Sequence, residues 1–168
     1  MSSSMYASSI PVFERMLGAT SEILRKAEAD AEARGIDQAV LLNSRLAPDM
    51  FPLVRQVQIA TDMAKGCCSR LAGLEVPKWE DNETSFAELR ERIERGLAHM
   101  RALVPDQLNG SEDRDIELLI GGQAMQFKGL PYLHFFVLPN FYFHLSMTYA
   151  ILRHNGLQIG KRDFLGAI

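Results

Sequence analysis

Apolar residues recur at alternating steps of three and four along four separate segments of this 168-residue chain. Such steps return to the same face of an α-helix, so each segment carries one apolar stripe that must be buried. The spacing predicts helices at about residues 10–34, 50–72, 85–104 and 139–155. We expect an all-α four-helix bundle, because in a bundle each stripe packs against the others.

The second stripe is built from smaller side chains than the others. Ala60 and Ala64 favour close packing of this helix against a neighbour. Ser8 or Ser9 is placed to cap the first helix, and Gly35 to end it. The stripes are Ile10, Phe13, Leu17, Thr20, Leu24, Ala27 and Ala31; Leu53, Val57, Ala60, Ala64, Cys67 and Leu71; Phe86, Leu89, Ile93, Leu97, Met100 and Val104; and Phe141, Leu145, Thr148 and Leu152.

The third helix begins with a capping signal and carries a dense run of charges. Ser85, with Glu88 three residues later, is the pattern of a capping box. The charged side chains fall between the apolar positions, so we expect them to form a solvated helix face rather than a binding patch. They are Arg90, Glu91, Arg92, Glu94 and Arg95.

The chain between the third and fourth helices follows a different pattern. Two short runs that contain apolar residues, 116–120 and 123–127, flank Gly121 and Gly122. This arrangement is typical of a β-hairpin, which we expect at about residues 115–128. The hairpin and the long link before the third helix permit crossover connections between helices. A chain of this length buries a sizeable core, so we expect a single domain over residues 1–168.

The charge balance argues against one class of function. Lys and Arg number 18 and Asp and Glu number 21, for a net charge of −3. Domains that bind nucleic acid normally carry a clear basic excess, so we expect no nucleic-acid partner. The content of 47% hydrophobic and 23% charged residues is typical of a globular chain.

Residues 132–152 contain no Asp, Glu, Lys or Arg and are long enough to span a membrane as a helix. Pro139, Asn140, His134 and His144 interrupt the stretch, so we interpret it as a buried loop followed by a core helix. The fourth helix is apolar nearly all round, which predicts burial on more than one side. We therefore expect no membrane association.

The two cysteines, Cys67 and Cys68, are adjacent in the sequence. A disulfide between neighbours would be strained, so we expect both thiols to be reduced, as in a cytosolic protein. The first ten residues contain neither the cationic stretch nor the long apolar run of a secretory signal. These features predict a cytoplasmic protein.

Local motifs for metal, phosphate or nucleophilic chemistry are absent from the sequence. The four histidines do not share the HxxxH or HExxH spacing that places two ligands on one helical face, and no GxSxG, Walker or GxGxxG pattern occurs. His144 lies on an apolar helix, where a buried, neutral, hydrogen-bonded imidazole is the common case. We expect Arg153 and Asp163 to pair and hold the C-terminal residues to the fourth helix.

Residues 143–166, FHLSMTYAILRHNGLQIGKRDFLG, with PNFY before them, resemble the closing segment of an uncharacterised bacterial and fungal family. That family belongs to the DinB-like (DinB/YfiT) superfamily of four-helix proteins. The resemblance implies an up-down-down-up bundle with the hairpin as a small insertion before the last helix, and a homodimer. Better-known members of the superfamily hold a divalent metal with three histidines, and some are thiol-dependent transferases or isomerases.

The resemblance also implies where such a metal site would lie. The landmarks Leu152, Arg153 and Gly156 place His144 at the second histidine position of the last helix and Asn140 at the first. The remaining ligand would come from the second helix, which offers Gln56 or Gln58. One histidine with two amides is a poor donor set for zinc or nickel, so we expect a degenerate site and no metal cofactor.

Two functions from different classes follow, with a third, structural one beside them. The first is a metal-free module that binds a small molecule or a partner, in a pocket formed by His144, Asn140, Tyr149 and the two glutamines. The second is an enzyme of thiol-transferase type that recruits a metal through His134 or His99, or uses His144 as an acid–base group. In the third, the hairpin and residues 132–143 form a dimer interface. No catalytic residue can be assigned.

Overall fold

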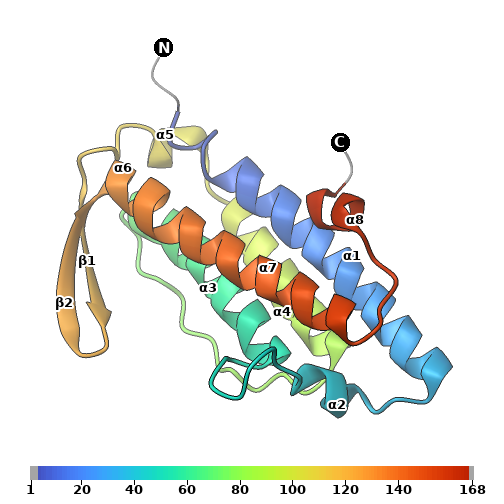
Figure 1. The fold of residues 1–168 in the computed structure, drawn as a ribbon. Helices are drawn as coiled ribbons and strands as arrows, with labels where there is room; N and C mark the ends of the chain where they lie inside the picture. Colours follow the sequence, from blue (N-terminus) through green and yellow to red (C-terminus); the bar gives the residue numbers. More distant parts are fainter. Residues whose placement is uncertain (1–3, 167–168) are drawn as a thin grey trace.

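The computed structural model describes residues 4–166, which form a bundle of four long helices (Figure 1). These are α1 (Ile10–Arg34), α3 (Leu53–Leu71), α4 (Phe86–Arg101) and α7 (Leu138–His154). Three shorter helices lie between them, α2 (Gln38–Leu42), α5 (Pro105–Leu108) and α6 (Gly129–Pro131), and α8 (Lys161–Leu165) follows the last of them. The expected all-α bundle with a hairpin before the last long helix is confirmed.

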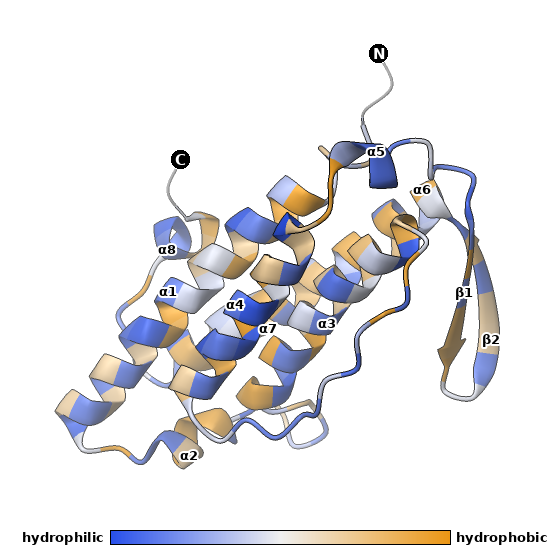
Figure 2. Ribbon diagram, turned by 180° about the vertical axis from the view of Figure 1, so that it is seen from behind, coloured by the Kyte–Doolittle hydropathy of each residue, from blue (hydrophilic) through white to orange (hydrophobic). Residues whose placement is uncertain are grey.

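The long helices run up, down, down and up (Figure 1), and α3 packs against both α4 and α7. The two central helices are parallel because the link between them, residues 72–85, returns along the whole bundle. Figure 2 shows this link on the outside of the bundle, with mainly hydrophilic residues in its second half. The link is therefore a crossover connection, which its length permits.

The expected stripes form the core. All of their residues are buried except Val104, which lies beyond the end of α4 and is more than half exposed. The predicted cap at Ser85 is present, because its Oγ accepts a hydrogen bond from the Glu88 amide at 3.1 Å. Ser9 does not cap α1 with its side chain, since its Oγ donates to the carbonyl of Met5.

The hairpin consists of β1 (Asp115–Ile120) and β2 (Gln123–Lys128), which pair antiparallel with Ile120 opposite Gln123. Gly121 and Gly122 form its turn with φ of 56° and 81°. Two consecutive positive φ angles are the requirement of a two-residue hairpin turn, and glycine meets it without steric cost. The hairpin stands beside α3 at one end of the bundle (Figure 1).

One expectation for the charge-free stretch is wrong. Residues Tyr132–Val137 are not a loop but a π-helical segment, η1, that continues directly into α7. α7 packs against both α3 and α1, in line with the expected burial on more than one side, while Phe135 is 81% and Phe143 51% exposed. By length and composition Gly129–His154 could cross a membrane. Its inner face, however, lies in the bundle core, as in a core helix of a soluble domain.

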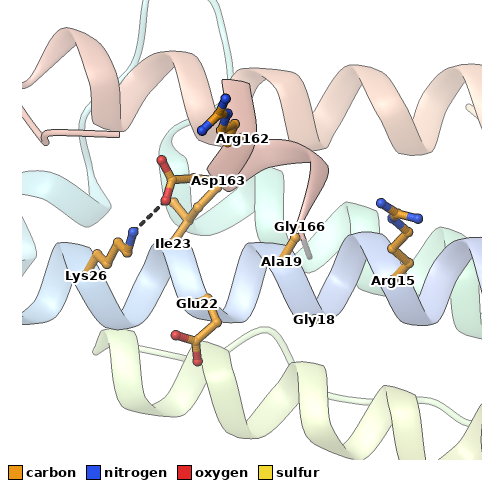
Figure 3. A pocket seen from close by; sticks show the side chains of 9 residues that line it. All are labelled: Arg15, Gly18, Ala19, Glu22, Ile23, Lys26, Arg162, Asp163 and Gly166. Carbon is orange, nitrogen blue, oxygen red and sulfur yellow. Dashed lines mark hydrogen bonds and ion pairs between the residues drawn. The ribbon is translucent and has the colours of Figure 1, made fainter. Parts of the chain in front are cut away.

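The ion pair of the C-terminal residues joins them to α1 rather than to α7. Asp163 pairs with Lys26 (Figure 3) and not with Arg153, contrary to expectation. Arg15 of α1 donates to the carbonyl of Leu165. Arg153 instead donates to the carbonyl of Leu157. The hollow of about 610 Å³ along this seam therefore has polar groups that already hold α8 in place.

Candidate functional site

The structure brings together two of the residues predicted for the degenerate metal site. His144 of α7 and Gln56 of α3 are both buried, and Nδ1 of His144 lies 2.7 Å from Oε1 of Gln56. The other amide atom of Gln56, Nε2, donates to the carbonyl of Phe51 at 3.0 Å. This second bond orients the amide, so Oε1 is the acceptor and Nδ1 of His144 carries the proton.

His144 is a neutral imidazole in this setting. Burial lowers its pKa, and the nearby charge of Arg55 lowers it further. With the proton on Nδ1, the lone pair of Nε2 is the free acceptor of the ring. Among the described residues, no group hydrogen-bonds to Nε2. The expected neutral, hydrogen-bonded core histidine is therefore present, with one nitrogen left over.

The other three predicted site residues do not join this pair. Asn140 donates its amide to the carbonyl of Phe136, four residues back on the same helix. Gln58 points toward the link between α3 and α4, where its Nε2 donates to Glu83 at 2.8 Å. Tyr149 lies against Phe164 of α8, with 6.0 Å between the ring centroids. The five residues thus lie in four separate environments.

A transition metal does not fit the residues at the superfamily position. The amide oxygen of Gln56 and Nδ1 of His144 are already bonded to each other, and the amide of Asn140 is used within its helix. Zinc and nickel prefer imidazole, thiolate or carboxylate ligands, usually three or more. Within residues 4–166, no three His, Cys, Asp or Glu side chains are grouped closely enough to hold a metal ion.

A serine–histidine contact elsewhere in the bundle also fails as a reactive pair. Ser69 Oγ lies 2.8 Å from Nε2 of His99, but its own hydrogen goes to the carbonyl of Lys65 at 3.0 Å. His99 is therefore the donor, so it cannot act as a base toward this hydroxyl. Ser69 is fully buried and does not line the cleft described below. The buried Cys67 and Cys68 are equally inert, since burial raises the pKa of both thiols.

Arg92 corrects the prediction for the charged run of α4. Its side chain is not solvated but fully buried, and three carboxylates surround it. Nη2 lies 3.0 Å from Asp62 and from Asp81, and Nη1 lies 2.9 Å from Glu83. Burial alone would lower the pKa of Arg92, but the bond to Glu83 and the neighbouring carboxylates raise it above its ordinary value.

The Arg92 cluster, formed by Arg92 with Asp62, Asp81 and Glu83, fastens the crossover link to the bundle. Trp79 of the same link adds to it, because its ring lies 4.1 Å from Nζ of Lys65 and 4.3 Å from the guanidinium carbon of Arg95. Such cation–π contacts stabilise the position of the ring. The cluster is a structural device, since every charge in it has a partner.

A cleft opens on the outward face of α3, between that helix, η1 and β1. Its volume is about 310 Å³, within the range of small-molecule sites. The residues of α3 that line it lie on one helical face, which the sequence analysis did not single out. The lining residues are Arg55, Ile59, Asp62, Met63, Arg70, Leu118, Leu119, Ile120, Tyr132 and Phe136.

An aromatic cluster borders the cleft, since two of its three rings, Tyr132 and Phe136, line it. The rings of Phe127 and Phe136 lie 5.2 Å apart, and each contacts the ring of Tyr132. The cluster joins β2 to η1 and so fixes the hairpin beside α3. Tyr132 is 1% exposed, and its hydroxyl accepts a hydrogen bond from Arg70 at 3.1 Å.

The fold and these sites define a DinB-like protein. The chain is similar to a DinB family member from Shewanella denitrificans, whose crystal structure matches with a TM-score of 0.88 and 41% identity, over 97% of this chain and 92% of that one. The model of a family described as a domain of unknown function, DUF1993, matches residues 5–165, and the chain belongs to that family. The resemblance in the closing segment is thereby confirmed. A comparison with curated proteins finds no match.

Proposed function

We propose that the protein is a metal-free binding module whose ligand occupies the cleft between α3 and the hairpin. One contrast supports this proposal. At the superfamily metal position, His144 and Gln56 are hydrogen-bonded to each other. The cleft instead combines apolar walls with a cation, Arg70, that has no carboxylate partner among the described residues. Apolar walls with a few polar groups are typical of small-molecule sites.

The test of the binding site uses two variants of the hairpin. Ile120 lines the cleft and Met125 does not, and their exposures are similar at 38% and 41%. We expect Ile120→Asp to abolish the rise in Tm that small organic ligands produce, and Met125→Asp to preserve it. An equal ligand response in both variants would contradict a site in the cleft.

The test of the metal-free state is elemental analysis of untagged protein that is purified without chelator and offered zinc, nickel, manganese and iron. We expect metal well below one equivalent per chain, because Nε2 of His144 is the one free donor there, while the amides of Gln56 and Asn140 are already hydrogen-bonded. Near-stoichiometric metal that disappears in His144→Ala would overturn the proposal. The cleft experiment is independent of this result.

An enzyme that uses His144 as a general base is the second candidate. The observation in its favour is the free Nε2, on an imidazole that is unprotonated at neutral pH. It predicts a reaction rate that falls only as the pH drops toward the pKa of His144, which burial holds below the ordinary histidine value of about 6.5. A turnover that survives His144→Ala would eliminate this candidate.

We also propose a homodimer that forms through the exposed outer face of η1 and α7. Phe135, Tyr142 and Phe143 are exposed on it, and residues 132–152 carry no Asp, Glu, Lys or Arg. Two identical uncharged faces can pack around a two-fold axis without burying an unpaired charge. Phe135→Asp should shift the mass in solution from dimer to monomer, while the equally drastic Val40→Asp on α2 should not. A wild-type monomer that binds lipid vesicles would contradict the dimer.

We further propose that the protein is cytoplasmic. Cys67 and Cys68 are both free and buried, so neither forms a structural disulfide. Free thiols are typical of reducing compartments. Fractionation of the native host should place the protein with cytoplasmic markers, and recovery with secreted or membrane proteins would contradict this location.

A further inference from the structure

We infer that the ligand of the cleft is a small organic acid, whose carboxylate binds Arg70 and Tyr132 and whose apolar part lies against α3 and β1. This inference rests on the proposed function, because it specifies the chemical class of the ligand in the same cleft. It follows from four features of the lining: an unpaired cation, a spare hydroxyl hydrogen, apolar walls and the absence of a second free charge.

Arg70 is the first feature. Its Nη1 donates to the hydroxyl of Tyr132, and no carboxylate within residues 4–166 lies at ion-pair distance from it. A guanidinium has five N–H donors in a planar fork that matches a carboxylate. One bond to a neutral hydroxyl leaves most of these donors and the whole charge available to a ligand.

Tyr132 supplies the second feature. Burial is the largest of the effects that raise its pKa, so the hydroxyl keeps its proton at neutral pH. The oxygen accepts from Arg70, but no acceptor for the hydroxyl hydrogen occurs among the described residues. A buried donor without an acceptor costs free energy, which a ligand oxygen would recover. Arg70 and Tyr132 therefore present two converging donors, the arrangement that a carboxylate accepts.

The remaining charges of the cleft are already neutralised. Arg55 pairs with Asp81, and Asp62 pairs with Lys65 at 2.8 Å and with Arg92 at 3.0 Å. The cleft therefore offers one unpaired positive charge, which matches a monoanion. A phosphate dianion would bring a second negative charge into a partly desolvated site without a partner, and an amine would meet Arg70 as a like charge.

The walls of the cleft determine the polarity and the size of the rest of the ligand. Ile59 and Met63 of α3, Leu118 of β1 and Phe136 of η1 line the space beyond the two donors. Their surfaces favour hydrocarbon over polar groups. The volume of about 310 Å³ is at the lower end for ligand sites, which favours one small molecule over a peptide or a nucleotide. A short-chain or aromatic monocarboxylate meets all of these conditions.

The experiment is isothermal titration of the full chain with sodium octanoate. Octanol, octylamine and inorganic phosphate are the ligand controls. We expect octanoate to bind, and octanol to bind at least about tenfold more weakly, as expected for the loss of one charged hydrogen-bonded contact. Octylamine and phosphate should show no binding at the same concentrations. No octanoate binding at millimolar concentration, or tighter binding of phosphate, would overturn the inference.

Three variants locate the binding. Arg70→Gln should weaken octanoate binding by about tenfold or more, and Tyr132→Phe by a smaller factor. Arg25→Gln, which changes an exposed arginine of α1, should have no effect. If Arg70→Gln does not fold, Tyr132→Phe still tests whether octanoate binds at these two residues, because it removes only the hydroxyl.

The inference and the proposed function fail in different ways. Equal binding of octanol and octanoate, unaffected by Arg70→Gln but abolished by Ile120→Asp, would retain the binding module and overturn the acid. Octanoate binding that persists in Ile120→Asp would place the acid outside the cleft and overturn both. Binding that Arg70→Gln and Ile120→Asp each abolish would support both.

Discussion

Arg92 of α4 and Arg70 of α3 have opposite surroundings. Arg92 is fully buried among three carboxylates and fastens the crossover link to the bundle. Arg70 donates to a neutral hydroxyl at the edge of a cleft and forms no ion pair among the described residues. A guanidinium whose charge is neutralised within the chain holds the fold together. One whose charge is left open beside apolar walls is available to a ligand.

The same contrast, between polar groups that have partners and polar groups that do not, distinguishes His144 and Gln56 from the cleft. His144 and Gln56 bond to each other across the α3–α7 contact, so their donors and acceptors are largely used. Tyr132 instead has a hydroxyl hydrogen without an acceptor. Binding in this protein is therefore expected at the cleft rather than at His144 and Gln56.

The largest expected effect comes from breaking the Arg92 cluster. Arg92→Met leaves Glu83, which is nearly buried, without its cation, and removal of one partner from a buried ion pair typically costs about 3–5 kcal/mol. Urea unfolding should show a loss of about 3 kcal/mol, at the lower end because Asp62 and Asp81 are partly exposed. A loss below about 1 kcal/mol would show that the cluster does not hold the link.

A fall in pH changes the charge of the histidines of the bundle but not that of the arginines, which stay charged. Burial lowers the pKa of both His144 and His99, so the unfolded chain binds more protons as the pH falls below about 6.5. The stability that each neutral histidine contributes is present above that pH and is lost as the pH falls toward its folded-state pKa.

The free energy of unfolding should therefore decrease between pH 7.5 and pH 5, at no more than about 1.4 kcal/mol per pH unit for each histidine. His144→Gln should reduce this decrease, and Arg92→Met should not change the part due to the histidines. Urea unfolding followed by circular dichroism at several pH values measures both effects. An unchanged decrease in His144→Gln would show that His144 is not the buried neutral group.

Tyr132→Phe tests the hydroxyl at the cleft without removing its ring. The ring contacts with Phe127 and Phe136 remain, and only the hydrogen bond from Arg70 is lost. Because a single hydrogen bond contributes about 1 kcal/mol, we expect a loss of that size or less in urea unfolding. A loss of several kcal/mol would make the hydroxyl part of the structural framework, as in the Arg92 cluster.

Arg70→Gln should have the smallest effect on stability of all. Its charge stabilises no carboxylate in the chain, so the free energy of unfolding should change by less than about 1 kcal/mol. This variant and Arg92→Met are a matched pair, since each removes one guanidinium beside α3. If both variants cost the same stability, the distinction between a structural and a binding arginine would fail.

The helices and the hairpin were predictable because their signals are local. Apolar spacing placed α1, α3, α4 and α7, and Gly121 and Gly122 placed the hairpin turn. The burial of Arg92 was not predictable in this way. Its partners come from α3 and from the crossover link, and nothing in the run of charges on α4 indicates that a distant loop covers one of them.

The candidate site was predictable only where the superfamily resemblance supplied positions. It placed His144 and Gln56 near each other, and they are in contact. Asn140, Gln58 and Tyr149 differ because their partners lie in η1, in the crossover link and in α8. The cleft requires three segments, α3, β1 and η1, to meet in space, and no spacing within one segment reveals that.

The most direct measurement is an NMR titration of ¹⁵N-labelled protein with octanoate, followed through backbone amide shifts. We predict the largest shifts at Ile59, Met63 and Arg70 of α3 and at Leu118 of β1, with little change at Gln56 and His144. Shifts centred on Gln56 and His144, or none near the hairpin, would contradict the assignment of the binding site to the cleft.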